Sequence, residues 1–169
     1  YMKTVDNARD DLAVRRIINV PKRGIGAATL TKVAVYAQEQ DLSFYDALKS
    51  EGLAAAAGRS YSKIRPFVDM IQRIRSQVEF LSVAEILNQI IEETGYVREL
   101  ELEDTEEARG RIENIDELIT KAVTYDEEHE KGTLSEFLEE IALVSDIDSV
   151  DNTEDRVLLM TLHSAKGLE

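Results

Sequence analysis

Apolar residues recur at helical spacing along most of this chain, and this periodicity most strongly limits how it can fold. The clearest stripe, over residues 64–78, consists of Ile64, Phe67, Val68, Ile71, Ile74 and Val78. The chain has only two prolines and is rich in alanine, leucine and glutamate, which favour helix. Pro66 is expected in the first turn of its helix, where proline is tolerated. The sequence therefore predicts a mainly α-helical fold.

Local start and stop signals place about six or seven helices. They are expected over residues 10–19, 27–38, 43–48, 64–78, 83–93, 112–123 and 133–144. The segments Ser82–Glu85 and Thr133–Glu136 have the spacing of capping boxes, and Gly95 can end the helix that follows the first of them. Residues 52–60 are mostly small, so we expect a loop there, although the alanine run could extend a helix.

The last thirteen residues differ from the rest of the chain. The short apolar run Val157–Leu162 predicts a buried strand, and a polar turn over residues 163–167 follows it. A single strand cannot satisfy its backbone groups alone, so we expect it to join a sheet outside this chain. We therefore interpret the chain as a piece of a larger protein, with residues 145–155 as an acidic surface linker.

Charge is distributed unevenly along the chain. Residues 1–78 carry 13 Lys or Arg and 8 Asp or Glu, whereas residues 79–155 carry 5 and 25. A polyanion would be repelled by the second block and could be held only by the first. The absence of cysteine excludes disulfides, and the two histidines, His129 and His163, make no metal-ligand cluster. No signal peptide or membrane span is predicted, which fits a cytoplasmic protein.

The segment Val20–Gly26 joins two predicted helices and contains the pattern Gly-Ile-Gly. Gly24 and Gly26 allow a tight turn and a close ligand approach, while Ile25 is expected to pin the turn to the core. Exposed amides at the start of the second helix form an anion site, and phosphate is its natural ligand. The available cations are Lys22, Arg23 and Lys32, with Arg15 and Arg16 from the preceding helix. Taken alone, the pattern also fits an ordinary helical corner.

Two segments resemble motifs of the superfamily 1 DNA helicases related to UvrD, Rep and PcrA, and the version here is most similar to the PcrA group. Residues 161–169, Thr-Leu-His-Ser-Ala-Lys-Gly-Leu-Glu, resemble helicase motif V. Residues 16–26, Arg-Ile-Ile-Asn-Val-Pro-Lys-Arg-Gly-Ile-Gly, resemble the entry to the 2B subdomain. Residues 1–11 look like the last helix of the RecA-like domain 2A, and residues 111–118 resemble a further stretch of 2B.

This resemblance implies a division of the chain into three parts. Residues 1–9 would end a 2A segment, residues 10–150 would form the helical 2B subdomain with a helix-hairpin-helix-like element, and residues 151–169 would return to 2A through motif V. The family implies an ATP-dependent 3′ to 5′ DNA helicase of DNA repair and replication, acting in the bacterial cytoplasm on the nucleoid.

The resemblance also implies roles for individual residues. Gly24–Gly26 would touch the duplex backbone, Thr161 and His163 would couple single-stranded DNA to the nucleotide, and Gly167 and Glu169 would lie near the ATP ribose. The Walker A lysine, the Walker B carboxylates and an arginine finger are missing, and phosphoryl transfer needs these groups together. We therefore expect ATP and Mg²⁺ to act in the parent protein, and the isolated chain to be a monomer without ATPase activity.

Two other interpretations stay open on sequence alone. The acidic block over residues 79–155 could be a surface that docks repair or transcription proteins, with the hairpin only structural. A stand-alone module that binds duplex DNA is the third interpretation, although the unpaired strand disfavours it.

Overall fold

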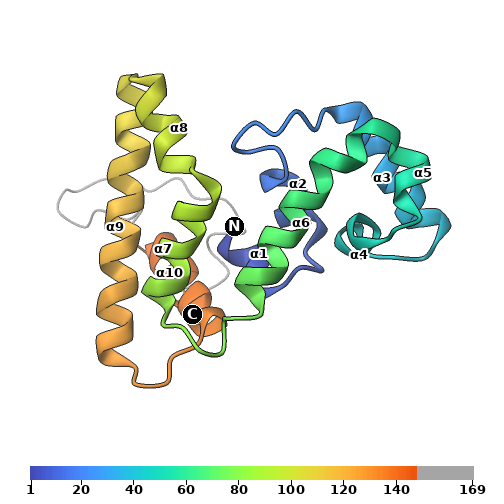
Figure 1. Ribbon diagram of the computed structural model, residues 1–169. Helices are drawn as coiled ribbons and strands as arrows, with labels where there is room; N and C mark the ends of the chain where they lie inside the picture. Colours follow the sequence, from blue (N-terminus) through green and yellow to red (C-terminus); the bar gives the residue numbers. More distant parts are fainter. Residues whose placement is uncertain (148–169) are drawn as a thin grey trace, which may run out of the picture.

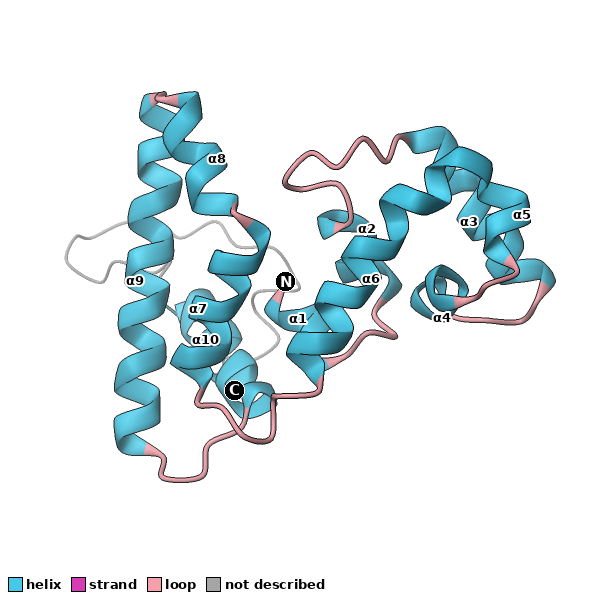
Figure 2. Cartoon of the chain, viewed as in Figure 1, coloured by secondary structure: helices cyan, strands magenta, loops and turns pink. Residues whose placement is uncertain are grey.

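The computed structural model describes the backbone of residues 1–147 and the side chains of residues 1–143. This part of the chain folds into α-helices joined by short connections (Figures 1 and 2). The predicted mainly α-helical fold is thus confirmed for the described residues. The strand expected at Val157–Leu162 and the linker before it lie outside them.

The first half of the chain forms a cluster of short helices around α6. Its elements are α1 (Met2–Asp6), α2 (Asp11–Ile17), α3 (Ala27–Glu39), α4 (Phe44–Lys49), α5 (Leu53–Ala57), the 3-10 turn η1 (Gly58–Ser60) and α6 (Tyr61–Arg75). Helix α3 packs on α4 and α5, and α4 packs on α6. The core between them is closed by side chains with no exposed surface, namely Phe44, Leu48, Leu53 and Ile64.

The second half adds four helices on the other side of α6 (Figure 1). They are α7 (Val83–Thr94), α8 (Tyr96–Glu103), α9 (Glu106–Glu128) and α10 (Leu134–Ile147). Helix α9 packs along both α7 and α8. The turn between α7 and α8 is made by Gly95 at φ +64°, a left-handed conformation that favours glycine, and this confirms the predicted helix end.

Helix α1 is fastened to the rest of the domain by an arginine. Arg75 Nη1, near the end of α6, donates to the carbonyl oxygens of Thr4, Val5 and Asp6 at 3.2, 2.7 and 3.2 Å. These carbonyls lie at the C-terminal end of α1, where helical amides no longer reach and a cation is favourable. The buried side chain of Val5 belongs to the common hydrophobic core, so α1 is part of the same packed unit.

Both capping boxes predicted from the sequence are confirmed. Ser82 and Glu85 bond reciprocally at the start of α7. Thr133 and Glu136 do the same before α10, because the Glu136 amide donates to Thr133 Oγ1 at 3.2 Å and the Thr133 amide donates to Glu136 Oε2 at 3.0 Å. Spaced polar residues of this kind fix helix starts locally, so the sequence suffices to place them.

Several details differ from the sequence predictions. Residues 52–60 are not a loop, because α5 and η1 occupy them. Alanine has the highest helix propensity, and the buried Leu53 and Ala57 give this segment an apolar side. Helix α8 was not predicted, since Leu100 is its single buried residue. These elements and α1 raise the helix number above six or seven, and Pro66 lies in the second turn of α6 rather than the first.

No helix among the described residues is long and apolar enough to cross a lipid bilayer.

Candidate nucleic-acid interface

The connection between α2 and α3, residues 18–26, is organised by the side chain of Asn19. Asn19 Oδ1 accepts from the amide of Arg23 at 2.9 Å and from the amide of Ile25 at 3.1 Å. Asparagine is a frequent turn residue because its short side chain can replace backbone partners in this way. Ile25 is 1% exposed, so the prediction that it pins the turn to the core is confirmed. The role of Asn19 was missed, although its residue type was the available signal.

The two glycines of the connection differ in whether the fold requires glycine at their position. Gly24 has φ +68°, and an added Cβ would lie 2.9 Å from Lys63 Nζ. A side chain at this position would therefore be strained. Gly26 is the N-cap of α3, with extended backbone at φ −84° and ψ 170°, and an added Cβ would meet no atom within 4 Å. The fold thus needs glycine at position 24, whereas at position 26 it leaves open space.

A row of backbone amides is unused at the start of α3. Within the described part of the chain, the amides of Gly24, Gly26, Ala27 and Ala28 donate to no protein group, and these residues are all exposed. The first amides of a helix have no helical partner, and the helix dipole adds partial positive charge there. Helix α3 has thirteen residues, so the predicted anion site lies at the N-terminus of a full helix.

The structure gives the predicted cations unequal positions. Lys22 and Lys32 are exposed, but Lys32 lies about 9 Å along the α3 axis from Gly26. Lys63, which sequence reasoning missed, comes from α6 and donates through Nζ to the Gly24 carbonyl at 3.3 Å. Arg15 is exposed and lies over the Phe44 ring, 4.4 Å from its centroid. Lys22 and Lys63 are therefore the lysines that flank the unused amides.

Arg23 is half-buried and directed into the protein. Its Nη1 lies 3.1 to 3.3 Å from the carbonyl oxygens of Ile17, Ile18, Val20 and Pro21. Its Nη2 donates to the hydroxyl of Tyr1 at 2.7 Å. Burial raises the pKa of the Tyr1 phenol, and the Arg23 guanidinium acts in the opposite direction. The hydroxyl therefore stays protonated at neutral pH and donates a hydrogen bond to the Val20 carbonyl.

A carboxylate from the acidic half of the chain reaches the same connection. Glu99 on α8 accepts from the Lys22 amide through Oε1 at 3.5 Å. The two residues are 77 positions apart, so no local pattern in the sequence indicates this contact. An anion bound at the adjacent amides would meet the negative charge of this carboxylate.

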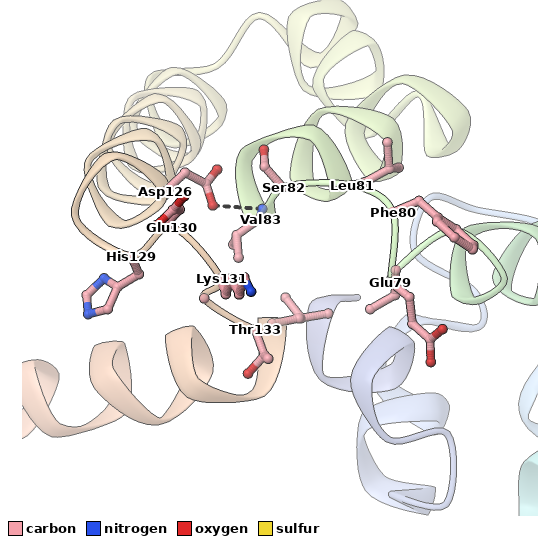
Figure 3. A pocket seen from close by; sticks show the side chains of 13 residues that line it. Glu79, Phe80, Leu81, Ser82, Val83, Asp126, His129, Glu130, Lys131 and Thr133 are labelled. Atoms are coloured by element: carbon pink, nitrogen blue, oxygen red, sulfur yellow. Dashed lines mark hydrogen bonds between the residues drawn. The ribbon is translucent and has the colours of Figure 1, made fainter.

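A hollow lies between the α6–α7 connection and the α9–α10 connection (Figure 3). Asp126 on α9 lines it and accepts from the amides of Val83 and Ala84 at 2.9 and 2.8 Å. The carboxylate thus satisfies the free amides at the start of α7 from a neighbouring helix. His129 lines the same hollow, is exposed and stacks on Tyr125 with ring centroids 4.3 Å apart. The Asp126 carboxylate therefore links α9 to the start of α7.

Replacing Asp126 by alanine is expected to lower the free energy of unfolding by about 2 kcal/mol, because two helix-terminal amides lose a charged acceptor. Urea unfolding followed by circular dichroism measures this change. The control is Asp116→Ala, which replaces an exposed residue of the same helix and should lower the free energy of unfolding by less than about 0.5 kcal/mol. Equal stability of the two variants would show that the Asp126 contacts contribute little.

The remaining predicted site residues lie outside the described part of the chain. They are Thr161, His163, Gly167 and Glu169. Among the described residues, no group of three or more His, Cys, Asp or Glu side chains could hold a metal ion.

Among the described residues, the unused amides at the start of α3 and the flanking lysines form an arrangement that can bind an anion such as phosphate. All of residues 1–169 match the family model described as the UvrD-like helicase C-terminal domain, and the chain belongs to this family. It is 40% identical over 171 residues to the ATP-dependent DNA helicase PcrA of Staphylococcus aureus (strain Mu50 / ATCC 700699) and 38% identical over 175 residues to that of Bacillus subtilis (strain 168). Both matches cover 100% of this chain, which spans only 23% and 24% of the two relatives.

Proposed function

We propose that this chain is the 2B part of an ATP-dependent DNA helicase of the UvrD and PcrA type, acting 3′ to 5′ in bacterial DNA repair and replication. Family membership and the names of the relatives support the helicase class. In this proposal residues 10–150 form 2B, and residues 1–9 and 151–169 belong to the RecA-like domain 2A. The whole helicase would use ATP and Mg²⁺, with Gly167 and Glu169 near the ribose and Thr161 and His163 on single-stranded DNA.

The described residues would hold the sugar-phosphate backbone of duplex DNA. The observation that carries this role is the row of unused amides at Gly24, Gly26, Ala27 and Ala28, flanked by Lys22 and Lys63. Amides and lysines bind phosphate oxygens but carry no information about bases. The domain would therefore grip any duplex ahead of the fork while the motor domains pull the single strand.

Binding of a duplex with a single-stranded tail, followed by fluorescence anisotropy across a salt series, tests this role. With about three phosphates neutralised, the affinity should fall by roughly 40-fold between about 50 and 200 mM salt. Two duplexes of unrelated sequence should bind equally within about two-fold. A clear preference for one sequence would contradict backbone binding.

The acidic residues fit a supporting role better than a docking role. Asp104, Glu107 and Glu93 are each paired with an arginine of this chain, at Arg109, Arg111 and Arg73. The unpaired acids of α8 and α9 would repel DNA and leave the hairpin as the face that meets the duplex. Contacts with repair or transcription proteins on this acidic surface would be additional to that grip.

Glu99→Gln is expected to strengthen duplex binding by about two- to five-fold at low salt, because it removes a negative charge beside the Lys22 amide. Glu101→Gln on the same helix is the matched control, since Glu101 is exposed and no contact with the hairpin is found for it among the described residues. The same anisotropy titration measures both variants. Equal affinities for the two variants would show that the Glu99 carboxylate does not oppose the DNA.

A further inference from the structure

Arg23 lies in the connection between α2 and α3, and its guanidinium is directed toward carbonyl oxygens of the protein. The carbonyls of Ile17, Ile18, Val20 and Pro21 surround Nη1. They lie at and beyond the end of α2, where carbonyls lack helical partners and a positive charge is favourable. The cation therefore closes the end of α2 and fixes the path of the chain into the turn.

The other contacts of Arg23 reach two further helices. Guanidinium nitrogens only donate hydrogen bonds, and Nη2 donates one to the hydroxyl of Tyr1, the residue directly before α1, at 2.7 Å. The planar guanidinium also lies 5.4 Å from the ring centroid of Phe67 on α6 and 5.9 Å from that of Tyr1. Tyr1 in turn donates to the Val20 carbonyl, within the connection itself. One side chain thus joins α1, α6 and the turn.

We infer that Arg23 is a positioning residue for duplex binding and not a phosphate ligand. The inference rests on the proposed function and assigns different roles to the neighbouring cations Lys22 and Arg23. Lys22 is exposed and contacts phosphate through its charge alone, whereas Arg23 holds the turn so that the unused amides face the duplex. Through Tyr1, the position of the turn is also coupled to α1.

Charge-conserving exchanges separate these tasks. Lysine lacks the planar fork of arginine and cannot serve several carbonyls and a stacked ring together. Arg23→Lys should therefore weaken binding of a tailed duplex by about ten-fold, and Tyr1→Phe by about three- to five-fold, because it loses the hydrogen bonds of the hydroxyl with Arg23 and Val20. Arg9→Lys, at an exposed arginine between α1 and α2, is the matched control: it keeps its charge and should bind within about two-fold of wild type.

The dependence of affinity on salt gives a second readout, which a loss of stability alone would not change. Each phosphate contact contributes about 0.9 to the slope of log affinity against log salt. Lys22→Ala should therefore reduce the slope by about 0.9, and Arg23→Lys should leave it unchanged. Binding is measured well below the melting temperature of every variant, so that each is fully folded.

Wild-type affinity for Arg23→Lys, together with a slope reduced by about 0.9 in Arg23→Gln, would overturn the inference, since this pair of results identifies a phosphate contact. Tyr1→Phe with wild-type affinity would remove the coupling to α1. Failure of the wild-type chain to bind any duplex would instead overturn the proposed function, and the positioning role with it. The outcomes for the two proposals are therefore distinguishable.

Discussion

Phe67→Ala should lower the free energy of unfolding by about 3–5 kcal/mol, the largest effect on stability that we predict. Phe67 is 1% exposed on α6, beneath the guanidinium of Arg23. Truncation removes buried apolar surface, leaves a cavity and deprives Arg23 of the ring on which it stacks. Since domains of this size are stable by only about 5–15 kcal/mol, such a loss is a large share of the total.

Phe80→Ala is the matched control, because the same side chain is 82% exposed at position 80. Its effect should be within about 0.5 kcal/mol. Urea denaturation of the two variants and of Phe67→Leu, which keeps most of the volume, measures the difference. A cost for Phe67→Ala no larger than that for Phe80→Ala would show that α6 does not form the centre of the core.

Local signals explain how much of the fold was predictable. Pairs of polar residues three positions apart predict the helix starts at Ser82–Glu85 and Thr133–Glu136. Gly95 marks a turn that needs a left-handed conformation. The stripe on α6 follows from the period of the helix, and its residues are buried as expected. Such features depend on neighbours in the sequence, so they can be predicted without knowledge of the tertiary structure.

The elements that were missed depend on distant neighbours or on weak periodicity. Helix α8 buries only Leu100, so it shows little apolar pattern, and its position follows from packing on α9. The segment that became α5 is a run of alanines, which have high helix propensity but no strong amphipathic signal. Both segments needed the rest of the fold to decide their conformation.

The candidate site was predictable in its backbone but not in its side chains. The pattern Gly-Ile-Gly between two helices predicts a turn with exposed amides; among the described residues the amides of Gly24 and Gly26 have no acceptor, whereas that of Ile25 donates to Asn19. The sequence cannot show that the Arg23 guanidinium donates to backbone carbonyls or that Lys63 lies beside Gly24. Nor can it show that the Glu99 carboxylate accepts from the Lys22 amide, 77 positions away. A count of charges in the sequence therefore identifies the region of a site but not its ligands.

Gly26→Asp should weaken duplex binding strongly without harming the fold. Position 26 is the N-cap of α3, its backbone is extended, and an added Cβ meets no atom within 4 Å. Aspartate is a preferred N-cap residue because its carboxylate accepts from the first helical amides, so the stability should be unchanged or slightly higher. The same carboxylate would occupy the amides proposed for phosphate and would repel it, so affinity should fall by more than about ten-fold.

The central claim is that the free amides at the start of α3 hold the DNA backbone. The most direct test is fluorescence anisotropy of a tailed duplex with wild type and Gly26→Asp across a salt series, with thermal melting of both proteins as the measure of fold. The account predicts salt-sensitive binding by wild type, binding by Gly26→Asp that is weaker by more than about ten-fold, and an equal or higher melting temperature of the variant. Undiminished binding by a folded Gly26→Asp protein would contradict it.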